Sequence, residues 1–83
     1  MKILYSRVVN ARRERELGRV EARVHMLVQP TPSSRPQGQS LVVSVPAYKR
    51  RQDVSLRKRV EREAALMAQL MHQTEQRLAL AVS

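Results

Sequence analysis

The sequence predicts a small α+β fold in which a three-stranded sheet packs on one long C-terminal helix. Two observations carry this prediction. Three segments in the first part of the chain have the alternating or β-branched composition of strands. From Val54 onward, apolar residues recur with the period of an amphipathic helix. Because 83 residues form only one small core, residues 1–83 are predicted to be a single domain.

Each of the three predicted strands has its own signal. Residues 3–9, ILYSRVV, combine β-branched and aromatic residues, and the charged sequence NARRERE that follows predicts a break. Residues 19–28 alternate strictly between apolar and charged or polar side chains, which favours a half-buried strand; a helix is the alternative, because some apolar residues there also recur at helical spacing. Residues 41–45 form the third strand, which Pro46 ends because it lacks an amide donor.

The segment between the second and third strands is predicted to be a mobile surface loop. Residues 29–40, QPTPSSRPQGQS, contain three Pro, three Ser and one Gly but no large apolar residue. Such a composition is too polar to bury and too rich in proline for a helix or a central strand.

The long helix is predicted over Val54–Gln76, with Asp53 as its N-cap, since a carboxylate there can accept amides of the first turn. Leu66 and Leu70 lie away from the main apolar stripe. The apolar arc is therefore too wide for one sheet face, and we expect a second surface to cover the remainder. Residues 78–83, LALAVS, either continue the helix or form a last short strand.

Composition argues against catalysis. The chain has no Cys, and its two His, at positions 25 and 72, lack the spacing of metal ligands. Gly18 and Gly38 are too few for a phosphate-binding loop. The acidic residues are mostly flanked by Arg, which indicates ion pairs rather than a catalytic cleft. We therefore predict a non-enzymatic protein without a metal or a bound cofactor.

Charge indicates an anionic partner. Sixteen Lys and Arg against seven Asp and Glu give a net charge of +9, and thirteen of the sixteen are Arg, which pairs in a bidentate manner with carboxylate and phosphate. The strongest cluster has seven basic residues within positions 49–62. A solvated helix face is the simpler interpretation of this cluster. No apolar run is long enough for a membrane span and the start lacks a signal peptide, so we expect a cytoplasmic protein.

The segment SLVVSVPAY, followed by a basic helix, resembles the small linker domains of phycobilisomes, of the rod-capping and core linker type. Those domains open with a strand that ends in a basic segment, here ILYSRVVNARR, and return with a strand that ends in Val-Pro and a Tyr, here Val45, Pro46 and Tyr48. An Arg-rich helix and a last strand, here LALAVS, follow. The resemblance covers most of the chain.

This resemblance implies a structural role in cyanobacterial light harvesting. The domain would occupy the central cavity of acidic phycobiliprotein hexamers at the cytoplasmic face of a photosynthetic membrane. Arginines would pair with acidic residues there, and apolar groups would approach bilins that belong to the partner. The chain itself would carry no covalent bilin, because it has no Cys.

The leading prediction is thus an assembly or linker protein that docks into an acidic protein complex. An RNA-binding or ribosome-associated protein is the alternative; the aromatic residues that single-stranded RNA binders use are nearly absent. A third possibility is a phage or bacterial adaptor that binds an acidic target through the helix. The predicted partner-binding residues are Tyr5, Arg7, Tyr48, Lys49, Arg50, Arg51, Arg57, Arg59 and Arg62.

Overall fold

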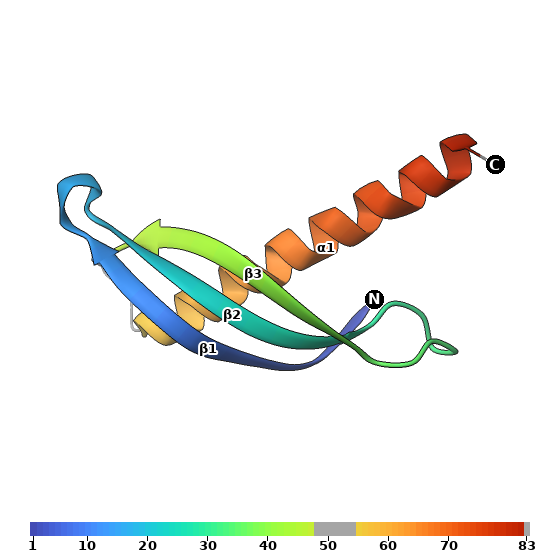
Figure 1. Ribbon diagram of the computed structural model, residues 1–83, viewed down its shortest axis with the longest axis horizontal. Coiled ribbons are helices and arrows are strands. Elements are labelled where there is room, and N and C mark those ends of the chain that lie inside the picture. The colour runs from blue at the N-terminus through green and yellow to red at the C-terminus, as the bar shows by residue number, and fades with distance from the viewer. Residues whose placement is uncertain (48–54, 83) are drawn as a thin grey trace.

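The chain folds as predicted, into a three-stranded antiparallel sheet and one C-terminal helix (Figure 1). The computed structural model describes residues 1–47 and 55–82. The strands are β1 (Lys2–Glu14), β2 (Arg19–Gln29) and β3 (Gln37–Pro46), with β2 in the centre, and the helix is α1 (Leu56–Val82). The helix packs on one face of the sheet and leaves the other face uncovered by any described element.

Two strands are longer than the sequence predicts. Residues 10–14, predicted as a charged break, continue β1 and pair with residues 19–23 of β2. Residues 37–40, predicted as loop, begin β3 and pair with residues 25–28. The central strand supplies backbone partners on both of its edges, so the ladders continue through polar sequence. The connection between β2 and β3 is therefore shorter than predicted and spans residues 30–36.

A tight turn joins β1 to β2. A single 3-10 turn, Arg15–Leu17, is followed by Gly18 at φ 61°, a left-handed conformation that favours glycine. The Gly18 amide donates to the carbonyl of Arg15, and the Gly18 carbonyl accepts the Ala47 amide at 2.8 Å. The turn thereby holds the chain that leaves β3 against the start of β2.

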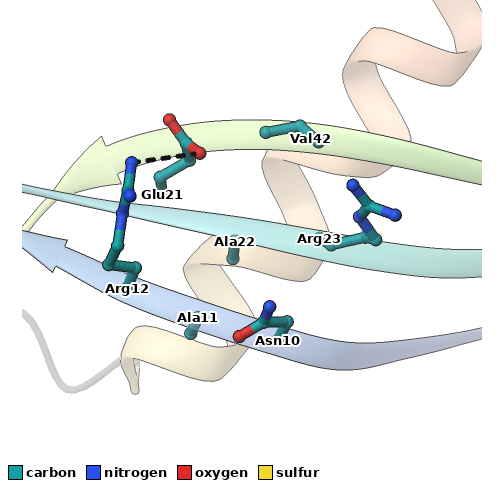
Figure 2. Close-up of a pocket in the computed structure, with 7 residues that line it drawn as sticks. All are labelled: Asn10, Ala11, Arg12, Glu21, Ala22, Arg23 and Val42. Carbon is teal, nitrogen blue, oxygen red and sulfur yellow. Dashed lines mark ion pairs between the residues drawn. The ribbon is translucent and has the colours of Figure 1, made fainter.

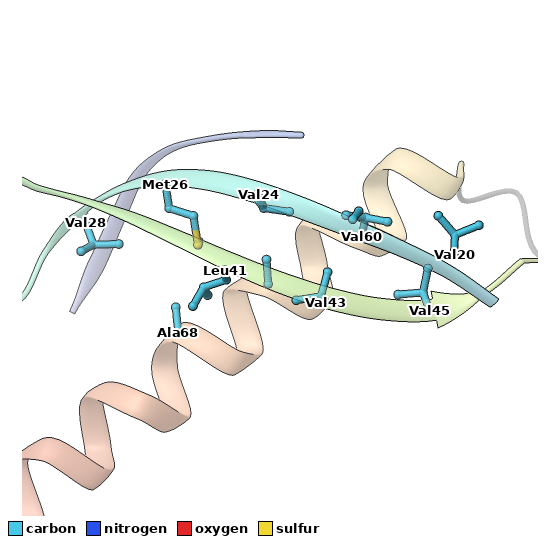
Figure 3. Close-up of a cluster of buried hydrophobic side chains, with 11 residues drawn as sticks. Val20, Val24, Met26, Val28, Leu41, Val43, Val45, Val60 and Ala68 are labelled. Carbon is cyan, nitrogen blue, oxygen red and sulfur yellow. The ribbon is translucent and has the colours of Figure 1, made fainter. Parts of the chain in front are cut away.

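The core lies between the sheet and the first half of α1 (Figure 3). The apolar side chains of β2 alternate into it as the strand prediction requires, so the helical alternative for residues 19–28 is wrong. The helix contributes small side chains at the contact, which lets its axis approach the strands closely. The buried residues are Val20, Ala22, Val24, Met26, Val28, Leu41, Val43, Val45, Val60, Ala64 and Ala68.

The helix differs from its prediction at both ends. Ser55 caps it, because the Ser55 hydroxyl accepts the Lys58 amide at 3.2 Å; Asp53, the predicted cap, lies outside the described residues. At its other end α1 continues through Leu78 to Val82, so this segment is helix rather than the alternative strand. The 27 residues of α1 are about 40 Å long, and the C-terminal half diverges from the sheet (Figure 1).

Candidate functional site

The outer side of α1 carries a continuous row of side chains, first basic and then apolar. Lys58, Arg62, Leu66 and Leu70 follow one another at four-residue spacing and lie opposite Ala64, which is fully buried against the sheet. All four are exposed; Leu66 keeps 57% and Leu70 64% of its surface in solvent. We call these four residues the outer row.

Beyond Ala68 the helix extends past the core as an overhang, residues 69–81. Every residue of the overhang is exposed except His72, which is half-buried. Its large apolar residues are Leu70, Met71, Leu78 and Leu80. The wide apolar arc predicts a second surface that covers these residues, and the described part of the chain does not supply one.

The helix diverges from the end of the sheet over a hollow of about 270 Å³. This hollow is lined by Val28 and Gln39 from the sheet and by Ala68, His72 and Glu75 from α1, among others. The side of the overhang that continues the core stripe therefore opens onto solvent as well.

The predicted basic residues of α1 have different surroundings. Arg62 is exposed and belongs to the outer row. Arg57 forms a surface ion pair with Glu61 at 3.4 Å. Arg59 as a partner-binding residue stays a prediction; it is half-buried, and its Nη1 donates to the Pro46 carbonyl at 2.9 Å. Arg59 thus ties the helix to the end of β3 and does not project from the surface.

The predicted residues of β1 are also exposed, and one of them lies near the helix. Tyr5 and Arg7 both lie in β1, at the edge of the sheet. Arg7 and Arg57 border the same groove of about 460 Å³, whose floor includes Val8 and Val60. The remaining predicted residues, Tyr48, Lys49, Arg50 and Arg51, lie outside the described residues.

Sequence reasoning missed a second candidate surface, the uncovered face of the sheet. Asn10 on β1 and Arg23 on β2 are direct cross-strand neighbours there. With Arg12, Glu21 and Val42 they surround a hollow of about 360 Å³ (Figure 2). The alternation of residues 19–28 indicates that Arg23 faces solvent, but it does not indicate which residue of β1 lies beside it.

Groups suited to catalysis or metal binding are not brought together in the described residues. No cluster of three or more His, Asp or Glu with a geometry that could hold a metal ion occurs in residues 1–47 and 55–82. Three ion pairs in the same ranges engage Glu14, Glu21 and Glu61, and all are at the surface. Within these residues, no helix is both long and apolar enough to cross a membrane.

Comparison with protein-family models, with curated proteins and with solved structures found no match to this chain. The resemblance to phycobilisome linker domains therefore stays a prediction. The last strand that this resemblance implies is not found where it was expected, because residues 78–82 belong to α1.

Proposed function

We propose that this protein is a non-enzymatic assembly protein that docks on an acidic protein through the outer row and the overhang of α1. The observation that carries the proposal is the change of chemistry along one exposed side of one helix. Lys58 and Arg62 are followed at the same spacing by Leu66 and Leu70, and the helix then continues without sheet beneath it. An amphipathic helix of this kind binds in a groove of a partner protein.

The apolar part alone is too small for stable binding. Full burial of a leucine contributes about 1.5–3 kcal/mol, so the exposed portions of Leu66, Leu70 and Leu80 together contribute about 3–6 kcal/mol. A micromolar complex requires about 8 kcal/mol net of the cost of association. The remainder must come from other contacts. Lys58 and Arg62, which form no ion pair within residues 1–47 and 55–82, supply them if the partner is acidic.

The apolar residues also favour a protein over a nucleic acid on this side of the molecule. Phosphate and base edges offer little to Leu66 or Leu70, whereas the buried centre of a protein interface is enriched in apolar contacts. An acidic phycobiliprotein hexamer is the specific partner that the sequence resemblance implies. RNA is the alternative partner, but it would account only for the basic residues of this surface and not for the apolar ones.

The test begins with proteins retained by the purified, immobilised chain at about 0.15 M salt, where exposed charges are screened beyond about 8 Å. Mass spectrometry identifies the retained protein, and calorimetry with that purified protein then compares Leu70→Gln with Leu17→Gln. Leu17 is a matched control, since it is 72% exposed but lies in the β1–β2 turn.

We expect an acidic partner whose affinity falls about fivefold to thirtyfold in Leu70→Gln, the equivalent of about 1–2 kcal/mol, and stays near the wild-type value in Leu17→Gln. Equal affinities of the two variants, or a monomeric chain that retains no acidic protein, would refute the proposal. The same measurement with purified phycobiliprotein hexamers tests the specific case. Retained material that nuclease removes would favour RNA.

A further inference from the structure

The uncovered face of the sheet carries a set of polar side chains that point away from the core. Six cross-strand pairs between β1 and β2 point to this face, and all of their members are exposed or half-buried. Two of them, Lys2 with Gln29 and Tyr5 with Leu27, lie at the end near the β2–β3 loop, and the set consists of the other four. The outward residues of β3 beside them are small, namely Ser40, Val42 and Ser44. The four pairs of the set are Arg7 with His25, Asn10 with Arg23, Arg12 with Glu21, and Glu14 with Arg19.

An irregularity in β1 determines that Asn10 and Arg12, in the middle of this set, point to the uncovered face. The register between β1 and β2 shifts between Val8 and Asn10, so Val9 is an extra residue in the ladder. Strict alternation from Val8 would turn Asn10 and Arg12 toward the helix. The shift turns them outward and directs Ala11 inward, opposite Ala22. Bulges that re-aim side chains in this way are frequent next to functional sites.

Charge on this face is only partly neutralised. Arg12 contacts both acids, Glu14 at 2.6 Å and Glu21 at 3.8 Å. Arg19 donates to the Ser44 hydroxyl at 2.7 Å and to the Ser44 carbonyl at 2.9 Å. Within the described part of the chain, the side chains of Arg7, Asn10 and Arg23 make no hydrogen bond or ion pair.

Asn10 and Arg23, together with the ion-paired Arg12 and Glu21, surround a hollow of about 360 Å³ (Figure 2). Arg12 and Glu21 lie at one end of it, and Asn10 and Arg23 lie at the other, with Val42 beside Arg23. The hollow is therefore open to a ligand that offers hydrogen-bond acceptors and a negative charge to a guanidinium and an amide held side by side.

We propose that this face binds duplex DNA, with the β1–β2 ribbon in the major groove. The major groove, about 12 Å wide, admits a two-stranded β-ribbon, and Arg and Asn are the side chains that read guanine and adenine there in a bidentate manner. The cations lie on β1 and β2, and the outward side chains of β3 are too short to obstruct the approach. Arg7 then contacts phosphate while Asn10 and Arg23 face base edges.

Other nucleic acids fit this face less well. A-form RNA has a deep, narrow major groove that side chains cannot read. Single strands bind through stacking on several aromatic side chains, and Tyr5 is the one aromatic residue that the structure describes. The inference does not depend on the helix surface proposed above, because Asn10 and Arg23 lie on the opposite face of the sheet and Arg7 lies at the sheet edge.

The test measures fluorescence anisotropy of labelled duplex DNA, duplex RNA and single-stranded DNA with the full chain over a series of salt concentrations. The double variant Arg7→Gln/Arg23→Gln is compared with Arg35→Gln/Arg77→Gln, which removes the same charge from exposed positions in the β2–β3 loop and the overhang. Circular dichroism checks that both variants remain folded.

We expect duplex DNA to bind more tightly than the other two nucleic acids. The first double variant should lose about tenfold or more in affinity. Its salt dependence should fall by about 0.9, because the variant removes one phosphate contact, that of Arg7, and each such contact contributes about 0.9 to the slope. The control variant should lose clearly less. Equal losses in the two variants, or RNA or single strands bound at least as tightly as duplex DNA, would overturn the proposal.

A measurement on the wild-type chain gives an independent result. Amide chemical shifts recorded during titration with duplex DNA should change most in the outward residues of β1 and β2. Changes concentrated in α1 would mean that the nucleic acid binds to the helix and would overturn the assignment of the sheet face.

Discussion

The packing of α1 on one sheet face predicts different costs for two valines of the same sheet. Val24 on β2 has 0% of its surface exposed, whereas Val42 on the neighbouring strand points to the uncovered face and keeps 49% exposed. Truncation to alanine removes the equivalent of two CH₂ groups. At about 0.8 kcal/mol per buried group, Val24→Ala costs about 1.6 kcal/mol in transfer energy and up to about 3 kcal/mol if the space stays empty.

The same arithmetic gives about 0.8 kcal/mol or less for Val42→Ala, since half of that side chain is already in water. In a domain of this size, 1 kcal/mol changes the melting temperature by about 4–8 °C. Val24→Ala should therefore melt about 6 °C or more below the wild type, and Val42→Ala about 6 °C or less below it. Thermal and urea unfolding followed by far-ultraviolet circular dichroism measure both. Equal destabilisation by the two variants, or a larger loss for Val42→Ala, would show that α1 does not cover the face that carries Val24.

Three further comparisons between variants test the turn, the helix cap and the helix–β3 contact by the same urea unfolding. Gly18→Ala should destabilise by about 1–2 kcal/mol because of its left-handed backbone, and Gly38→Ala, whose added Cβ meets nothing within 4 Å, should be nearly neutral; equal effects would contradict the turn geometry. Ser55→Ala should cost about 0.5–2 kcal/mol as a lost cap, which Ser55→Asp should restore. Arg59→Gln should destabilise by about 1–3 kcal/mol through its lost hydrogen bond to a backbone carbonyl, more than Arg57→Gln, whose surface ion pair contributes about 1 kcal/mol or less; the reverse order would mean that Arg59 does not hold the helix to β3.

The faces of the strands could be predicted from sequence, but their ends could not. A two-residue period assigns each side chain of β2 to the core or to solvent, and those assignments are confirmed. Residues 10–14 and 37–40 lack the apolar alternation that predicts a strand. They are strand nonetheless, because their backbone pairs with β2. Pairing of this kind depends on how far the neighbouring strand extends, and composition does not encode that length locally.

The candidate surfaces, too, were predictable only in part from the sequence. The excess apolar arc of the helix was visible in Leu66 and Leu70, and the described part of the chain leaves both exposed. The hydrogen bond from Arg59 to Pro46 could not be predicted, because it is a tertiary contact between the helix and the end of β3 that helical periodicity does not contain. Asn10 and Arg23 become neighbours only through the register shift in β1, and no residue type in that strand predicts such a shift.

Strand alternation separates the side chains that hold the fold from those that are free to bind. The buried residues of β2 point to α1, while Arg23 on the same strand points away from it. On α1 the same separation follows from helical period, since Ala64 contacts the sheet and Leu66 and Leu70 do not. A core of valine and alanine leaves little stability in reserve. A partner that binds only the folded chain therefore adds directly to its stability, on whichever of the two faces it binds.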